Sequence, residues 1–491
     1  MLDKLKNMEK QKIKEMICMI VGVILVMLMI WNFRWIYNAH YQIHIETFYF
    51  KASSIFCLII LLMRRINYKN WRLYAGSIGY AGYAVFYLVT HNNDYGPEYR
   101  EYLIWQFVLR LLILIIILDS FSKKEITHLE KKNLIYSISV IVAVVFCTAL
   151  YYNAMLHMLV PAIVLFITPI SEEKWKKFLI CFSCGYYIIF VISMAQSFIN
   201  NQHMYAFRYY FGNFDSPYGA AAITMGGLIS ALYIFEMIRD KKNKFMTIVS
   251  VISIIFPCVM ILIIGSRSVQ LAAFVVVFLY FFMDNRSTEK ENMKRKRAML
   301  IVLGCIVLIL LIGALIVFNL NLTGIEDKIG LVGNEAVRDR LTYYVSRINW
   351  LRNTKSYGFV FADGDKINIL DHLVSKRISI WYLFMQQVTM WGNTVLIPVG
   401  EYGPHSIYVY QLVKFGWIGG FLSIISYILG AITAGKRLND NRRVYLIPFL
   451  WMVYYLVAGI GENPFNEFDI AVFFMIFQYP LLFQLKKNMK E

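Results

Sequence analysis

The feature that most constrains this chain is a series of apolar stretches, each long enough to cross a bilayer, that recurs along nearly its whole length. A helix needs roughly 20 mostly apolar residues to cross about 30 Å of hydrocarbon. Only 16% of the 491 residues are charged, whereas a soluble globular protein carries about 25%. The sequence therefore predicts an all-α fold, a polytopic integral membrane helix bundle, and excludes disorder, coiled coil and a string of soluble domains.

The apolar stretches predict about 14 membrane spans, within a range of about 12 to 14. They lie near residues 15–33, 48–63, 73–90, 103–119, 134–152, 155–170, 178–198, 217–238, 245–264, 269–284, 298–318, 404–433, 444–461 and 468–485. Lys and Arg gather in short runs between them, and basic loops face the cytoplasm. An even number of spans then places both termini in the cytoplasm.

Most of the basic residues behind the net charge of +18 belong to the short runs that orient the spans. This placement argues against nucleic-acid binding. All seven cysteines fall inside apolar stretches, so no disulfide framework is expected. We interpret Cys181-x-x-Cys184, which has redox or metal spacing, as two small packing residues within a span.

One charged interval, residues 319–403, interrupts the apolar pattern, and the orientation of the spans places it outside the cytoplasm. Apolar residues from Val337 to Leu351 recur at helical spacing and predict an amphipathic helix. A second helix is expected from about Asp371 to about Val388. We therefore divide the chain into spans one to eleven (1–318), an extracytoplasmic loop (319–403), and spans twelve to fourteen with a cytoplasmic tail (404–491).

Four extracytoplasmic motifs contain residues that could carry chemistry. Arg267 lies in the turn Gly265-Ser266-Arg267-Ser268, and Arg208 opens the segment that leads to Pro217. The other two motifs are Arg377-x-x-x-Trp381, whose spacing puts both side chains on one helix face, and Pro404-His405-Ser406-Ile407-Tyr408. A histidine there can act as a proton acceptor. Glu462, at the outer end of the thirteenth span, is a candidate acidic partner for these arginines. On pattern alone, each motif is better explained by interfacial charges and anchors.

Two basic residues, Arg110 and Lys414, fall within predicted spans. A charge near the bilayer centre costs roughly 2.5–3.5 kcal/mol on insertion scales, so both should face the bundle interior or a cavity. We expect each to have a structural role as a counter-ion. Lys414 follows His405 by nine residues, about 2.5 turns, so on one helix the two would point to opposite sides and would not share a site.

The sequence predicts no metal and no cofactor. It contains no Gly-rich nucleotide loop ending in Lys-Ser/Thr, no His-Glu-x-x-His and no Cys/His cluster. The early external loops, residues 34–47 and 91–102, lack an Asp-x-Asp or Glu-x-Asp pair. This absence argues against a metal-dependent membrane glycosyltransferase.

In order and sidedness, these motifs resemble the O-antigen ligase and polymerase superfamily of WaaL- and Wzy-like membrane proteins. The resemblance covers roughly residues 205–485. It rests on Arg…Gly-x-Phe…Pro at 208–217, Ser-Arg at 266–267, Arg-x-x-x-Trp at 377–381, His-x-x-Tyr followed by Gly416 at 405–416, and three following spans. The chain departs from the family pattern in two ways. Family members often have about twelve spans, and many have Pro-Asn where this chain has Pro217-Tyr218.

The resemblance implies a glycosyltransferase of the bacterial plasma membrane whose active site faces outward. Its donor would be a glycan on a polyprenyl diphosphate, transferred to an acceptor hydroxyl with inversion and without a metal. Arginine side chains would stabilise the diphosphate, and a histidine would take the hydroxyl proton. The implied catalytic residues are His405, Arg377 and Arg267, and the implied substrate-binding residues are Arg208, Trp381, Tyr408 and Glu462.

The resemblance leaves the acceptor open. A polymerase extends another lipid-linked repeat, whereas a ligase uses a lipid or protein carrier. The Lys-, Ile-, Asn- and Tyr-rich composition is typical of an AT-rich genome, such as that of a Gram-positive bacterium, whose envelope has no lipopolysaccharide core. We therefore favour a polymerase, working with a flippase and a chain-length regulator. A lipid-linked oligosaccharide flippase or other transporter and a peptidoglycan-type glycan polymerase are the competing hypotheses.

Overall fold

The computed structural model describes residues 2–36, 42–63, 70–91, 96–123, 134–140, 142, 168–199, 203–205, 208–210, 217–239, 243–264, 266–283, 377–392, 406–461, 477–483 and 485. Within these residues the fold is helical apart from one short hairpin, in which two strands pair antiparallel. The prediction of a helix bundle is confirmed for this part of the chain.

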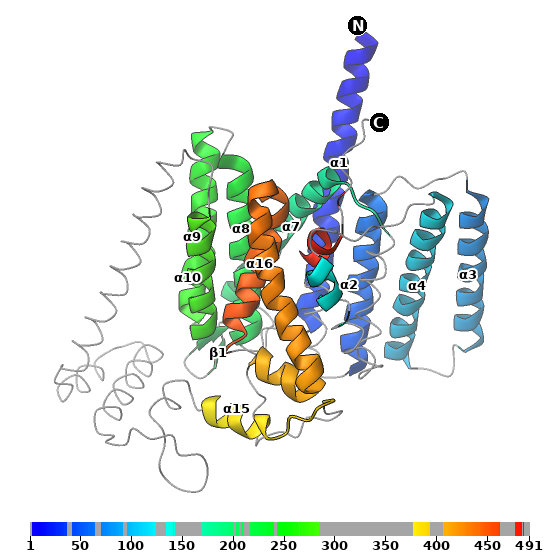
Figure 1. The fold of residues 1–491 in the computed structure, drawn as a ribbon. Coiled ribbons are helices and arrows are strands. Elements are labelled where there is room, and N and C mark those ends of the chain that lie inside the picture. The colour runs from blue at the N-terminus through cyan, green and yellow to red at the C-terminus, as the bar shows by residue number, and fades with distance from the viewer. Residues whose placement is uncertain are drawn as a thin grey trace, which may run out of the picture.

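The helices are arranged as a bundle with α3 at one edge (Figure 1). Their bounds are α1 (Leu2–Ile36), α2 (Gln42–Met63), α3 (Trp71–Thr90), α4 (Pro97–Lys123), α7 (Glu172–Ile199), α8 (Pro217–Ile238), α9 (Lys244–Ile264), α10 (Arg267–Phe282), α15 (Arg377–Met385) and α16 (Ile407–Ala458). The strands are β1 (His203–Tyr205) and β2 (Arg208–Tyr210).

Six of the described helices, α1, α4, α7, α8, α9 and α16, are long and apolar enough to cross a membrane. The spans predicted at 217–238 and 245–264 coincide with α8 and α9 to within one residue. The predicted span at 298–318, most of those at 134–152, 155–170 and 468–485, and the amphipathic helix at 337–351 lie outside the described residues. The count of fourteen spans therefore stays a prediction.

Helix α16 differs from the two continuous spans predicted over it. Its backbone leaves helical geometry at Gly416 (φ 72°, ψ −177°) and at Asn441 (φ −158°, ψ 93°), which divides it into stretches 407–415, 417–440 and 442–458. The span predicted over 404–433 is therefore interrupted at Gly416. Glycine alone adopts the backbone conformation at 416 without strain, because a Cβ atom would clash there.

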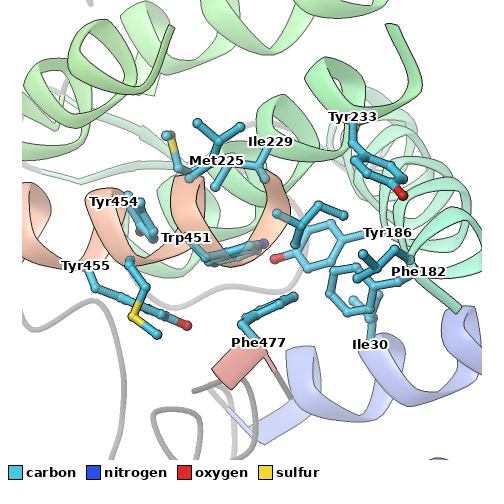
Figure 2. Close-up of a cluster of buried hydrophobic side chains, with 14 of the residues drawn as sticks. Ile30, Phe182, Tyr186, Met225, Ile229, Tyr233, Trp451, Tyr454, Tyr455 and Phe477 are labelled. Carbon is cyan, nitrogen blue, oxygen red and sulfur yellow. The ribbon is translucent and has the colours of Figure 1, made fainter. Parts of the chain in front are cut away.

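The core lies where α7, α8 and the last stretch of α16 meet (Figure 2). Trp451 stacks on Phe477 with ring centroids 5.2 Å apart, and Tyr186 lies 5.9 Å from the same indole. A Cβ at Gly226 would clash with the ring of Tyr186, so this glycine lets α7 and α8 approach closely.

The two basic residues of the predicted spans lie in different surroundings. Lys414 is buried, with 7% of its surface exposed, and its Nζ donates to the hydroxyl of Tyr410 at 2.8 Å. Arg110 is exposed on α4, beside Tyr80 of α3. The inward orientation predicted for Lys414 is confirmed, but the one predicted for Arg110 is wrong, because among the described helices α3 alone lies beyond α4 at this edge of the bundle (Figure 1).

Candidate functional site

The described parts of the predicted site lie at the end of the bundle opposite the N-terminus, where Figure 1 shows both β1 and α15. Strand β2, which contains Arg208, packs against α8 and α9. Helix α9 ends at Ile264, and α10 begins at Arg267 after a buried Ser266. The side chain of Arg267 is exposed. The fold thus brings the segments of Arg208 and Arg267 to the same end of the bundle.

Helix α15 begins at Arg377 and packs on the first stretch of α16, the one that follows His405 in the chain. Phe384 forms a small buried cluster with Val409 and Val413, and Trp381 packs against this cluster. The indole Nε1 of Trp381 is buried and has no hydrogen-bond partner within the described chain. The second helix expected in the external loop is therefore present over part of its predicted length, and it lies against Val409 and Val413, which follow the predicted histidine motif.

Two glycines join the segment after α15 to the break in α16. Gly392 (φ 91°) and Gly416 lie so close that a Cβ on either one would collide with backbone atoms beside the other. The N–H of Trp417 donates to the carbonyl of Thr389 at 3.0 Å. Thr389 Oγ1 also accepts from the N–H of Gly392 at 2.9 Å. This junction fixes α15 relative to the 407–415 stretch.

The start of α16 is tied to the end of the same element. The carbonyl of Gly459 accepts from the Ile407 N–H at 3.0 Å and from Ser406 Oγ at 3.1 Å. The hydroxyl of Tyr408 donates to the carbonyl of Leu456 at 2.6 Å. Ser406 follows His405 in the chain, and Gly459 precedes Glu462 by three residues. His405 and Glu462 themselves lie outside the described residues.

The 407–415 stretch also contains polar side chains that the sequence analysis left out of the site. Lys414 lies over the ring of Tyr410, with Nζ 5.2 Å from the ring centroid. Gln411 is buried, and its Oε1 has no hydrogen-bond partner in the described part of the chain. The spacing of Tyr410 and Lys414 by four residues was the available signal, since such pairs meet on one helix face.

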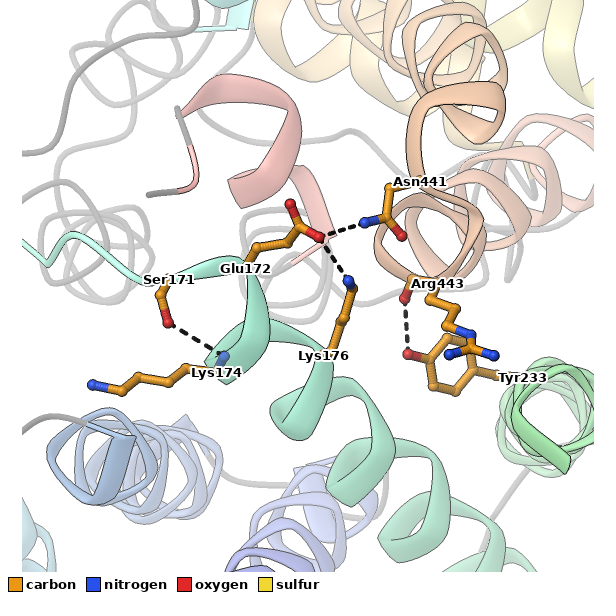
Figure 3. A network of polar contacts seen from close by, with 7 residues as sticks. All are labelled: Ser171, Glu172, Lys174, Lys176, Tyr233, Asn441 and Arg443. Carbon is orange, nitrogen blue, oxygen red and sulfur yellow. Dashed lines mark hydrogen bonds and ion pairs between the residues drawn. The ribbon is translucent and has the colours of Figure 1, made fainter. Parts of the chain in front are cut away.

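A separate polar network holds the Asn441 break, at the end of the bundle where α7 begins and α8 finishes. Glu172 Oε1 accepts from Asn441 Nδ2 at 2.5 Å and from Lys176 Nζ at 2.6 Å (Figure 3). In the same view, Tyr233 donates to the carbonyl of Arg443 at 2.8 Å. These bonds join three helices around the break, and none involves a residue of the predicted site.

A buried ion pair lies next to this network. Arg442 Nε is 3.4 Å from Glu236 Oε2, and Glu236 is fully buried. The guanidinium also donates to the carbonyls of Tyr280 at 2.7 Å and Met283 at 2.8 Å, and the Tyr280 hydroxyl donates to Glu236 at 3.1 Å. Both charges are thus hydrogen-bonded, which a buried pair requires.

The described residues contain no group of three or more His, Cys, Asp or Glu side chains placed to hold a metal ion. The five described cysteines, including Cys181 and Cys184, are free thiols. The polar chemistry at the β1 and α15 end is therefore that of arginine, lysine, tyrosine and amide groups as far as the structure describes it.

Residues 170–321 match the family model of the O-antigen polysaccharide polymerase Wzy. The match includes α7 to α10, and with them the segments of Arg208 and Arg267. No curated protein matches the chain. Together with the six long apolar helices, the match indicates an integral protein of the bacterial inner membrane. The resemblance inferred from the sequence motifs is thereby confirmed: over residues 170–321 this chain is similar to the O-antigen polysaccharide polymerase Wzy family.

Proposed function

We propose that this chain is a surface polysaccharide polymerase, a glycosyltransferase that joins lipid-linked glycans on the outer face of the plasma membrane. The observation that carries the proposal is the match of residues 170–321 to the polymerase family. The substrates are a glycan on a polyprenyl diphosphate as donor and a second lipid-linked repeat as acceptor. No nucleotide is needed, because cleavage of the bond to the diphosphate drives the transfer.

In the proposed reaction, a hydroxyl oxygen of the acceptor attacks the anomeric carbon of the donor glycan from the face opposite the diphosphate. The bond from that carbon to the diphosphate oxygen breaks, and the diphosphate leaves with the electron pair. His405 takes the hydroxyl proton, a role typically worth about 10²–10⁴-fold in rate. The product has the inverted configuration at the anomeric carbon.

The arginines stabilise the leaving group in this scheme. A guanidinium stays protonated and matches two phosphate oxygens at once, so Arg267 and Arg377 hold the developing charge, with Arg208 assisting. The positions of β2 and the start of α10 at one end of the bundle support this role, as does the packing of α15, which begins at Arg377, on the stretch that follows His405.

The remaining residues bind substrate. Trp381 and Tyr408 offer aromatic faces to a sugar ring. Tyr408 offers only its ring, because its hydroxyl already donates to the carbonyl of Leu456. Glu462 accepts hydrogen bonds from sugar hydroxyls or pairs with an arginine. The site lies on the extracytoplasmic side, with about 14 spans, cytoplasmic termini and the loop 319–403 outside. A flippase supplies the donor, and a chain-length regulator limits growth.

The experiment is a gel profile of surface polysaccharide from cells that carry His405→Ala, with the membrane abundance of the variant measured. His91→Ala is the matched control, because His91 ends α3 and stacks on Tyr87 away from the proposed site. We expect the ladder to collapse to single repeats in the His405 variant alone. Long lipid-linked chains that fail to be attached would instead indicate a ligase. An unchanged ladder would rule out His405 as the base and favour a flippase.

A further inference from the structure

Arg110 is a charged side chain exposed in the middle of an apolar helix. The stretch of α4 that is long and apolar enough to cross a membrane runs from Pro97 to Phe121, so Arg110 follows its start by 13 residues and precedes its end by 11. At 1.5 Å per residue, both ends are roughly 17–20 Å away along the axis. An arginine side chain is too short to reach either interface from there. The guanidinium therefore faces hydrocarbon or something that replaces it.

Two other charges in the apolar helices are paired within the described chain. Lys51 of α2 lies 2.6 Å from Glu101, and Arg442 pairs with Glu236. Arg110 interacts with the hydroxyl of Tyr80, which is a neutral group, but no described carboxylate is paired with it. Ionisable residues within membranes almost always face a protein interior or pair with one another. Within the described chain, Arg110 thus lacks the acidic partner that such a residue usually has.

Near Arg110, α3 has an exposed aromatic residue and a glycine with open space beside it. Tyr83 is exposed on α3, and Gly79 has no atom within 4 Å of the place where a Cβ would lie. Small residues let membrane helices approach closely enough to pack and to form polar contacts. Figure 1 shows α3 and α4 at the edge of the bundle, and α2 packs against α4. We call the surface formed by Gly79, Tyr83 and Arg110 the α3–α4 edge.

We propose that the α3–α4 edge binds a transmembrane helix of a different membrane protein, and that this helix carries an aspartate or glutamate near the middle of the bilayer. Charge complementarity selects this partner, because a carboxylate would pair with the guanidinium and supply the hydrogen-bond acceptors that hydrocarbon lacks. A second copy of this chain is disfavoured. In a two-fold dimer through this edge the same patch meets itself, so the two Arg110 side chains would face each other.

The test places a photo-crosslinking amino acid at Tyr83 in the full chain, in its native membrane. The control places it at Ile252 of α9, an equally exposed apolar position in a helix that could cross a membrane. We expect one crosslinked partner from position 83 only, attached through a transmembrane segment that contains Asp or Glu. Arg110→Leu should reduce this product roughly tenfold or more, as expected for the loss of one member of a desolvated charge pair.

A charge exchange makes the result decisive. Arg110→Glu should abolish the crosslink, and replacing the carboxylate of the captured helix with arginine should restore it in that variant. Four outcomes would overturn the proposal: crosslinking to lipid alone, to another segment of the same chain, to a second copy, or to a partner whose yield does not depend on Arg110. Membrane abundance of each variant shows that the chain is inserted, so a lost product cannot be attributed to a missing protein.

Discussion

Helices α8 and α3 are similar in length, with 22 and 20 residues, and each contains three glycines, yet they lie in opposite surroundings. In α8, a Cβ at Gly226 or Gly227 would strike an aromatic ring of α7. In α3, Gly79 and Gly82 have open space around them. Small residues in an apolar helix therefore mark a close approach only when a partner helix is present, and α3 lacks one over much of its surface in the described chain.

The charges follow the same division. In the bundle around α8, Arg442 and Glu236 are buried together and share hydrogen bonds with α10. At the α3–α4 edge, Arg110 is exposed and has no described carboxylate beside it. Substitutions in the first region should thus change the free energy of unfolding of the isolated protein. Substitutions at the edge should change it little and affect association instead.

The largest effect is expected for Glu236→Ala. Removing one member of a buried pair leaves Arg442 uncompensated, which typically costs about 3–5 kcal/mol in the free energy of unfolding. Thermal unfolding of the purified protein in nanodiscs measures this loss. Asp440→Ala is the control, because its pair with Arg437 is largely exposed on the Asp440 side and should be worth at most about 1 kcal/mol. Equal losses for both variants would contradict the distinction between the regions.

A loss of about 3 kcal/mol is expected for Gly416→Ala. Alanine at φ 72°, ψ −177° is strained, and its Cβ would press on the backbone of Met390 and Gly392. Because this junction holds α15 to the 407–415 stretch, we also expect polysaccharide chain growth to fall. Thermal unfolding and the gel ladder are measured together. A stable variant with a normal ladder would show that the junction does not position the site.

The opposite sign is expected for Gly82→Ala in α3. The added methyl group meets nothing within 4 Å, and alanine is favoured over glycine in a helix by roughly 0.5–1 kcal/mol. The same change at Gly226 of α8 should instead cost about 1–3 kcal/mol, since the site is already filled by Tyr186. Thermal unfolding of the two variants side by side checks the prediction, and a shift of the same sign would refute it.

The sequence predicts a structural feature when the residues that cause the feature are neighbours in the chain. The bounds of α8 follow from a continuous apolar stretch after Pro217, so they were predictable. The break at Gly416 was not, because its backbone conformation fits a segment, residues 389–392, that meets it only in the fold. The candidate site shows the same division: the order of the motifs was readable, but the junction that holds α15 on α16 was not.

The smallest effect on stability is expected for Arg110→Leu, and it separates two interpretations of that residue. If Arg110 were a structural counter-ion within the chain, as its position in the sequence predicts, its removal would leave an unpaired charge and cost several kcal/mol. Because it is exposed and has no described carboxylate partner, we expect the free energy of unfolding of the purified protein to change by no more than about 0.5 kcal/mol. Thermal unfolding in nanodiscs, beside Glu236→Ala, measures the difference. A loss as large as that of the Glu236 variant would mean that Arg110 is paired inside the chain, and the α3–α4 edge would then belong to the bundle rather than to a partner.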